Sequence, residues 1–238
     1  MFRLARTVSY IVGYAAFVTP KIKSVENQLN QIENVYDRDT FGFKMPRKWA
    51  KGILRRAGVK VIVEGSLKDN HDGVLIVSNH EGNFDIPVMI HALEKPFGFV
   101  SKKEVEKIPF LSRWMNLMNC IYLDRTDRRS SIQMIKDGVS ALKEGHSILI
   151  FPEGTRSKGK GMNEFKAGSF KLAKSANVPI IPVSIKGTSD IMEKYNSKKM
   201  VPGTVFVTIH PPINPTIFQD HSLQEVANKV HDIIENDL

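Results

Sequence analysis

The chain has 238 residues, of which 42% are hydrophobic, and its formal net charge is +9. This length and composition suit one large domain with its own core and argue against disorder. The positive charge indicates an anionic partner, and the lone cysteine, Cys120, excludes an intrachain disulfide and suits a reducing compartment. Because Cys120 lies in an apolar run, we expect a buried and unreactive thiol.

Residues 1–45 are predicted to form a helical element that associates with a membrane. Residues 8–18 are apolar, and four basic residues flank them: Arg3, Arg6, Lys21 and Lys23. This run is shorter than the ~20 apolar residues of a spanning helix, and Pro20 follows it in place of a small-x-small cleavage site. We therefore expect an amphipathic or half-inserted helix at the membrane interface, with a signal peptide or a core helix as alternatives.

Residues 46–58 are predicted to form the first helix of the main domain, which covers residues 46–238. Pro46 suits the first helical position, and Gly58 suits the end of the helix. Basic residues crowd much of its surface, which fits an anionic lipid surface or, equally, a solvated face of a domain helix.

From residue 59 onward, short β-branched and apolar runs alternate with helical patterns. The predicted strands cover residues 59–65, 73–79, 97–101, 120–124, 147–152, 179–185 and 204–210. Residues 130–145 are predicted to form a helix between two strands, with Ser130 or Ser131 as its N-cap and Gly145 at its end. Such a unit places its strands in parallel, and continuous apolar strands indicate a sheet covered on both faces. The sequence thus predicts a single α/β domain whose mostly parallel, roughly seven-stranded sheet is flanked by helices.

The stretch IVSNHEGNFDIP, residues 76–87, spans the end of the strand predicted over 73–79 and the residues after it, where ligands bind in sheets of this class. His80 and Asp85 cannot meet within one helix, but they can meet if His80 lies on a turn through Gly82 and Asp85 opens the next helix. A carboxylate that orients an imidazole makes a general base near neutral pH. The alternatives are a turn histidine beside a helix-capping aspartate, or a metal site. Three further histidines could complete a metal site, without any recognised zinc spacing: His71, His91 and His146.

A second motif, FPEGTRSKGKG, covers residues 151–161 and begins at the end of the strand predicted over 147–152. The segment from Gly154 to Lys160 has the G-x-x-x-x-G-K spacing of a P-loop. However, Gly161 replaces the Ser or Thr that would hold magnesium, and a clear helical pattern resumes only later. A nucleotide site is therefore the weaker of the two interpretations of this motif.

The stronger interpretation of this motif is an anion site without a metal. Gly154 lets the backbone approach an anion, Thr155 offers donors, and Arg156 can hold a phosphate bidentately. Glu153 is better suited to orient an arginine or to bond a hydroxyl. Two basic residues that follow other predicted strands, Arg125 and Lys102, are candidates for the same phosphate site.

Together these motifs resemble the bacterial 1-acyl-sn-glycerol-3-phosphate acyltransferases of the phospholipid/glycerol acyltransferase family. Four blocks occur in the family's order: N-H-x-x-x-x-D at residues 79–85, CIYLDR at 120–125, FPEGTRS at 151–157 and the proline-bearing strand VPIIPV at 178–183. The resemblance covers roughly residues 50–215. The pattern H-x-x-x-x-D is weak alone and specific when joined to E-G-T-R.

The resemblance implies transfer of a fatty acyl group from acyl carrier protein or coenzyme A to the sn-2 hydroxyl of lysophosphatidic acid, which forms phosphatidic acid. It implies direct attack, with His80 as base and Asp85 as its orienter, and neither a metal nor another cofactor. It assigns the acceptor's phosphate to Glu153, Gly154, Thr155, Arg156, Arg125 and, most weakly, Lys102. The expected location is the cytoplasmic face of the cell membrane, as a monotopic or peripheral protein with membrane lipids and no nucleic acid as partners. Alternatives are acylation of glycerol 3-phosphate or another lysophospholipid, and a non-catalytic, membrane-docked phospholipid-binding protein.

Overall fold

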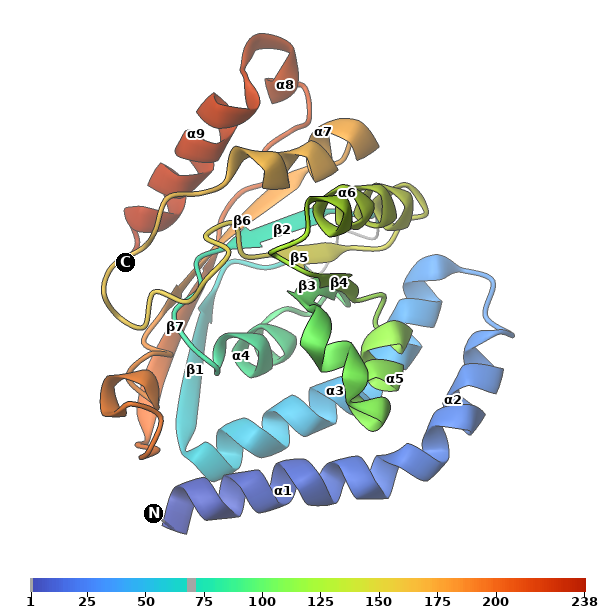
Figure 1. The fold of residues 1–238 in the computed structure, drawn as a ribbon, viewed down its shortest axis with the longest axis vertical. Helices are drawn as coiled ribbons and strands as arrows, with labels where there is room; N and C mark the ends of the chain where they lie inside the picture. The colour runs from blue at the N-terminus through green and yellow to red at the C-terminus, as the bar shows by residue number, and fades with distance from the viewer. Residues whose placement is uncertain (1, 68–71) are drawn as a thin grey trace.

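The computed structural model describes residues 2–67 and 72–238, and its centre is a seven-stranded sheet (Figure 1). The strands are β1 (Val59–Glu64), β2 (Leu75–Ser78), β3 (Gly98–Lys102), β4 (Ile121–Leu123), β5 (Ile148–Ile150), β6 (Ile180–Lys186) and β7 (Gly203–Ile209). Their order is β1-β7-β6-β2-β5-β3-β4, and every neighbouring pair is parallel except β6 and β7. The predicted mostly parallel sheet and each of its strands are therefore confirmed, with small shifts at the strand ends.

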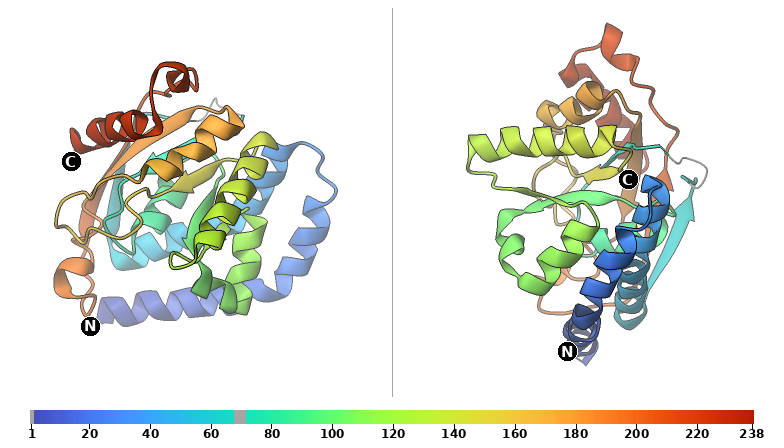
Figure 2. Two further views of the ribbon diagram at one scale, coloured as in Figure 1. Left: turned by 45° about the horizontal axis from the view of Figure 1, so that its top comes forward. Right: turned by 90° about the vertical axis from the view of Figure 1, so that its right-hand side faces the viewer.

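Helices cover both faces of the central strands (Figures 1 and 2). Ile76 and Leu149 face one apolar cluster, with α3 (Val35–Ala57) and α4 (Asp85–Ala92). Leu75, Val77 and Ile148 face the other, with α6 (Arg128–Lys143), α7 (Lys171–Ala176) and α9 (Leu223–Glu235). Because successive strand residues point to opposite faces, the unbroken apolar runs fill two cores at once. Full burial of each such side chain contributes roughly 1.5–3 kcal/mol.

Helix α3 begins eleven residues before the predicted start at Pro46, so that prediction is wrong. The side chain of Asn34 caps the helix at the amide of Asp37, and Pro46 lies buried inside it. The packing of residues on both sides of the proline, such as Phe43 and Ile53, outweighs the local cost of an interior proline. Gly58 ends the helix in the left-handed conformation, as predicted. Helix α3 runs across residue 46, so no break in secondary structure marks the predicted division of the chain there. That division stays a prediction.

Helix α6 is capped by Asp127, whose side chain accepts from the amide of Arg129, and not by Ser130 or Ser131 as predicted. Ser130 instead accepts a hydrogen bond from the amide of Asp124. Gly145, with a φ of +96°, follows the helix as expected. The remaining elements are η2 (Lys103–Lys107), α5 (Pro109–Leu117), η3 (Ala167–Phe170), η4 (Glu193–Tyr195) and α8 (Ile217–Asp220).

The N-terminal segment is helical, with α1 (Phe2–Val18), η1 (Thr19–Lys21) and α2 (Ile22–Leu29). Helix α1 lies along α3 (Figure 1), where Arg6 and Tyr14 donate to the carbonyls of Arg56 and Met45 at 2.6 and 2.9 Å. Four large apolar side chains on α1 are exposed: Phe2, Val8, Val12 and Phe17. None of the described helices is long and apolar enough to cross a membrane.

Cys120 is buried, and burial raises the pKa of its thiol to about 12. The predicted unreactive thiol is therefore confirmed, because the nucleophilic thiolate is not formed near neutral pH.

Candidate active site

The imidazole of His80 meets the carboxylate of Asp85, as the spacing predicts. β2 ends at Ser78, and Asn79 then fixes the turn by exchanging two hydrogen bonds with the backbone of Ile185 on β6, at 2.7 and 2.8 Å. Asp85 is the first residue of α4, and its Oδ2 lies 2.5 Å from Nδ1 of His80. The turn after the carboxyl end of β2 and the start of α4 thus hold the two side chains together.

Asp85 is fully buried, yet three donors surround its carboxylate. Oδ2 also accepts from the amide of Gly82 at 3.0 Å, and Oδ1 accepts from the hydroxyl of Thr188. These bonds offset the cost of burying a carboxylate. Nδ1 of His80 is engaged by this carboxylate, so Nε2 is the ring nitrogen left for a ligand.

Two further contacts hold His80 in place, one at its ring and one at its backbone amide. Its side chain is 17% exposed and lines a cleft, while the ring stacks on Phe151 with centroids 4.1 Å apart and planes 15° apart. The amide of His80 donates to Oε1 of Glu153 at 2.6 Å. A fixed ring is what a general base needs, because proton transfer requires hydrogen-bond geometry with the substrate.

Glu153 lies buried behind the His80 turn and does not line the cleft. Its Oε2 accepts from both the amide and the side chain of Asn163, at 2.9 and 2.7 Å. The amides of Ser157 and Lys158 donate to the carbonyls of His80 and Glu81, at 2.8 and 3.0 Å. The two sequence motifs are therefore joined by side-chain and main-chain bonds.

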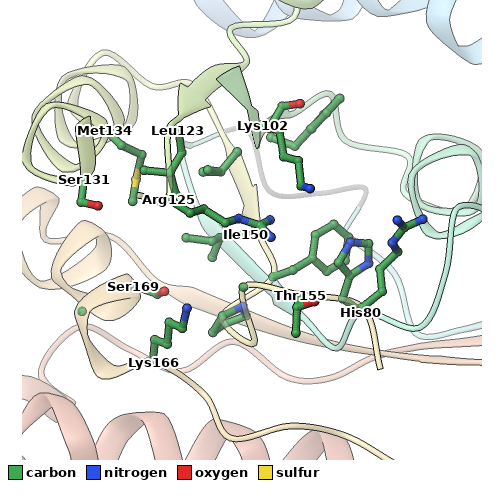
Figure 3. Close-up of a pocket in the computed structure, with 18 of the residues that line it drawn as sticks. His80, Lys102, Leu123, Arg125, Ser131, Met134, Ile150, Thr155, Lys166 and Ser169 are labelled. Carbon is green, nitrogen blue, oxygen red and sulfur yellow. The ribbon is translucent and has the colours of Figure 1, made fainter. Parts of the chain in front are cut away.

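The cleft has a volume of about 950 Å³ and lies at the carboxyl ends of β3, β4 and β5 (Figure 3). Apolar side chains form much of its wall, including Ile86, Phe99, Leu123, Ile135 and Ile150. Every charged side chain of its described lining is a lysine or an arginine. Such a cleft suits a ligand with both an apolar chain and negative charge.

The cleft brings together most of the predicted phosphate-binding residues: Lys102, Arg125, Gly154, Thr155 and Arg156. Loss of solvation lowers the pKa of Arg125, Glu104 opposes this shift, and the positive charge of Arg156 lowers the pKa further. Two guanidinium groups thus act on each other beside an apolar surface, which favours an anion between or near them.

Arg156 is held by residues that the sequence reasoning missed. Its guanidinium donates to the side chain of Asn83 and lies 3.9 Å from Oε1 of Glu193, whose side chain is 2% exposed. Oε1 of Glu193 also accepts from the amide of Asn83 at 2.8 Å. No local pattern marked Glu193, because its partners lie more than 30 residues away in the sequence.

Thr188 and Glu81 are the other missed residues. Thr188 follows the carboxyl end of β6, so the strand-end rule could have marked it. Oε2 of Glu81 accepts from the amides of Gly187 and Ser189 and lies 3.2 Å from the hydroxyl oxygen of Thr188, whose proton goes to Asp85. Burial raises the pKa of Glu81, with those bonds acting in the opposite direction and Asp85 in the same one.

The other histidines named as possible metal ligands lie elsewhere. Nδ1 of His146 lies 2.7 Å from Asp39 and 3.1 Å from Asn119, before the amino ends of β5 and β4. His91 is in the last turn of α4, and His71 lies outside the described residues. The metal alternative therefore gains no support at His80 from the described histidines.

The second motif lacks the architecture of a P-loop. No helix begins directly after residues 154–160, and the next helical turns are η3 and α7. The segment instead turns through glycines at 154, 159 and 161, each with positive φ. It therefore offers no helix N-terminus to a nucleotide phosphate at this position.

The fold and this pair of motifs define an acyltransferase. The acyltransferase family matches residues 60–186, and the chain belongs to that family. The probable 1-acyl-sn-glycerol-3-phosphate acyltransferase of Mycoplasma pneumoniae is 30% identical, covering 96% of this chain and 90% of the relative. The 1-acyl-sn-glycerol-3-phosphate acyltransferase of Escherichia coli is 33% identical over 70% of this chain and 67% of its own length.

A solved structure agrees with these relatives. The crystal structure of the 1-acyl-sn-glycerophosphate (LPA) acyltransferase PlsC from Thermotoga maritima matches with a TM-score of 0.78 and 27% identity. The match covers 99% of this chain and 95% of that one. The family predicted from the motifs, the enzyme class and the fold are therefore confirmed.

Proposed function

We propose that the protein transfers a fatty acyl group from a thioester to the sn-2 hydroxyl of lysophosphatidic acid and so forms phosphatidic acid for phospholipid synthesis. The observation that carries the proposal is the His80–Asp85 pair, which opens onto an apolar cleft whose charges are all positive. The names of the relatives support the same acceptor.

The chemistry follows from the pair. Nε2 of His80 accepts the proton of the sn-2 hydroxyl while the hydroxyl oxygen bonds to the thioester carbonyl carbon. The tetrahedral intermediate then expels the thiolate, which takes the proton from His80 as the carbonyl re-forms. Asp85 stabilises the imidazolium, and Thr188 and Gly82 hold Asp85 in place. Attack is direct, and the thiol belongs to acyl carrier protein or coenzyme A.

Basic residues of the cleft bind the acceptor's phosphate in this proposal. Arg156 and Arg125 supply guanidinium groups, Thr155 supplies donors, and Lys102 adds a positive charge. Glu153 shapes this end of the site from behind, because its carboxylate holds the amide of His80. Charge-assisted bonds of this kind contribute roughly 1.5–3 kcal/mol each.

The proposed location is the cytoplasmic face of the membrane, as a monotopic or peripheral protein. The exposed apolar side chains of α1 and the basic residues beside them support binding to an anionic lipid surface. A lysolipid can then present its headgroup without leaving the bilayer completely.

One assay tests the function. Purified protein is given labelled lysophosphatidic acid with acyl carrier protein or coenzyme A thioesters in the presence of a chelator, and products are separated by chromatography. We expect phosphatidic acid from wild type and a loss of about 10²–10⁴-fold in kcat for His80→Ala. Glycerol 3-phosphate and other lysophospholipids serve as competing acceptors. Faster acylation of one of these, or no turnover with either donor, would contradict the proposal.

A further inference from the structure

A lysine from outside the recognised motifs reaches the turn of the second motif. A Cβ atom added at Gly154 would lie 2.6 Å from the ammonium nitrogen of Lys166. Gly154 also has a φ of +70°. Lys166 lines the cleft, and Figure 3 shows its side chain pointing into the space toward which Arg125 also projects. The glycine thus leaves room for an ammonium group.

The segment that carries Lys166 is fastened to the motif at two points. The amide of Lys166 donates to the carbonyl of Pro152 at 3.1 Å, and Asn163 donates twice to Glu153. Between them, Phe165 is buried in the core. The backbone of Lys166 therefore has a fixed position relative to Gly154, although its side chain is long and exposed.

The ammonium group of Lys166 has no carboxylate partner in the described chain. Ion pairs in that part of the protein engage other cationic residues, among them Arg113, Arg156 and Lys194. The described cleft lining contributes no acidic side chain either. A cation without a counter-ion, in the same cleft as Arg125, attracts an anion into this part of the cleft.

We propose that Lys166 binds a substrate phosphate, together with Arg125, and that residue 154 is a glycine partly to admit this ammonium group. The inference rests on the proposed function. Both the lysolipid acceptor and the phosphopantetheine arm of the thioester donor carry a phosphate, so the ligand chemistry is shared. The kinetic arms of the experiment distinguish the two sources.

The test compares Lys166→Met, which removes the charge, with Lys166→Arg, which keeps it. Lys160→Met is the matched control, because Lys160 is an exposed lysine of the same loop that does not line the cleft. We expect Lys166→Met to raise one KM by about tenfold or more with a smaller change in kcat. Lys166→Arg should restore most of the affinity, and Lys160→Met should resemble wild type.

Two arms assign the phosphate. A raised KM for lysophosphatidic acid, with no change for phosphate-free 1-acylglycerol, assigns Lys166 to the acceptor. A raised KM for the thioester donor assigns it to the donor. If Lys166→Met changes neither KM, or affects both acceptors equally with an unchanged donor KM, the inference is overturned while the proposed function stands.

A binding measurement keeps the test independent of turnover. Calorimetry with glycerol 3-phosphate and with coenzyme A should show weaker binding of at least one of them to Lys166→Met and unchanged binding to Lys160→Met. Equal affinities in all three proteins would overturn the inference even if the wild type formed no phosphatidic acid.

The role of Gly154 needs a double-mutant cycle. Gly154→Ala introduces strain from the positive φ in any background, but it crowds residue 166 only when the lysine is present. We expect Gly154→Ala to raise the affected KM more in wild type than in Lys166→Ala. Equal increases would show that the glycine serves the backbone conformation alone.

Discussion

The His80 ring is held on several sides, by Asp85 at Nδ1, by the face of Phe151 and through its own amide by Glu153. None of these contacts uses Nε2. Changes behind the ring should therefore affect proton transfer more than substrate binding.

Asp85→Asn is expected to lower kcat by about 10²–10⁴-fold with a smaller change in the KM for the acceptor, because the imidazolium loses its negative partner. Steady-state kinetics with varied acceptor checks this. His91→Gln, on the same helix with an exposed side chain, is the control and should keep near-normal turnover. Near-normal kcat in Asp85→Asn would remove the His–Asp base and leave Asp85 as a residue of the turn.

Thr188→Val should reduce both stability and turnover, because Oδ1 of buried Asp85 loses the hydroxyl that donates to it. An unsatisfied buried group costs about 1–3 kcal/mol of unfolding free energy. Urea unfolding and kcat are measured together. Thr188→Ser keeps the hydroxyl and should recover most of both, whereas a Val variant as stable and as active as wild type would show that the hydroxyl is not needed.

At the scale of elements, α1 has one face occupied by polar bonds to α3 and another that exposes large apolar side chains. The exposed apolar face of α1 has no partner within the described chain, and burying it in a lipid surface would lower its free energy.

Replacing Val12 and Phe17 together by serine should weaken binding to anionic vesicles by about tenfold or more, since burial of each side chain is worth roughly 1.5–3 kcal/mol. Vesicle sedimentation measures the change. Tyr195→Ser removes an exposed aromatic residue of η4 and serves as the control. Unchanged sedimentation of the double variant would contradict membrane docking by α1.

At the scale of the whole molecule, the net charge of +9 should speed encounters with anionic thioester donors. The donor's kcat/KM is expected to fall as ionic strength rises, because the Debye length shrinks from about 10 Å at 0.1 M to about 3 Å at 1 M. An uncharged acyl thioester is the control and should show little salt dependence. A flat profile for the charged donor would argue against steering.

Lys95 is buried in the segment just before β3. The free energy of unfolding should therefore depend on pH through the titration of this side chain. Burial lowers the pKa of Lys95 from 10.5 to about 8, with Asp72 and Asp39 opposing the shift. Between about pH 8 and 10.5 the unfolded chain binds the proton more strongly than the folded one, so stability rises with pH in that window.

Lys95→Met removes this contribution. Wild type should gain about 1–2 kcal/mol of unfolding free energy relative to Lys95→Met between pH 7.5 and 9.5. Urea unfolding at both pH values measures the difference, and Lys60→Met, at an exposed lysine of β1, is the control. A constant difference between wild type and Lys95→Met would mean that Lys95 keeps its proton throughout this range.

The sequence predicted best what is encoded locally. Short apolar runs, several of them rich in β-branched residues, marked every strand, Gly58 marked the end of α3, and the turn between His80 and Asp85 followed from its own residues. Pro46 misled because tertiary packing overrode a local rule. Thr188 and Glu193 could not be paired with the His80 turn, since more than 100 residues separate the partners.

The main-chain bonds from Ser157 and Lys158 to the His80 turn have a consequence for protein engineering. Amides donate whatever side chain they carry, proline excepted, so position 157 should accept a wide range of substitutions. Position 158 is more restricted, because Lys158 has a φ of +58°, which favours glycine or asparagine and disfavours β-branched residues. The number of residues between Phe151 and Lys158 has no such freedom. Inserting one residue would slide both amides past their carbonyls and uncouple Arg156 from the imidazole. Libraries and chimaeras built on this chain should therefore vary residue identity at position 157 and preserve loop length.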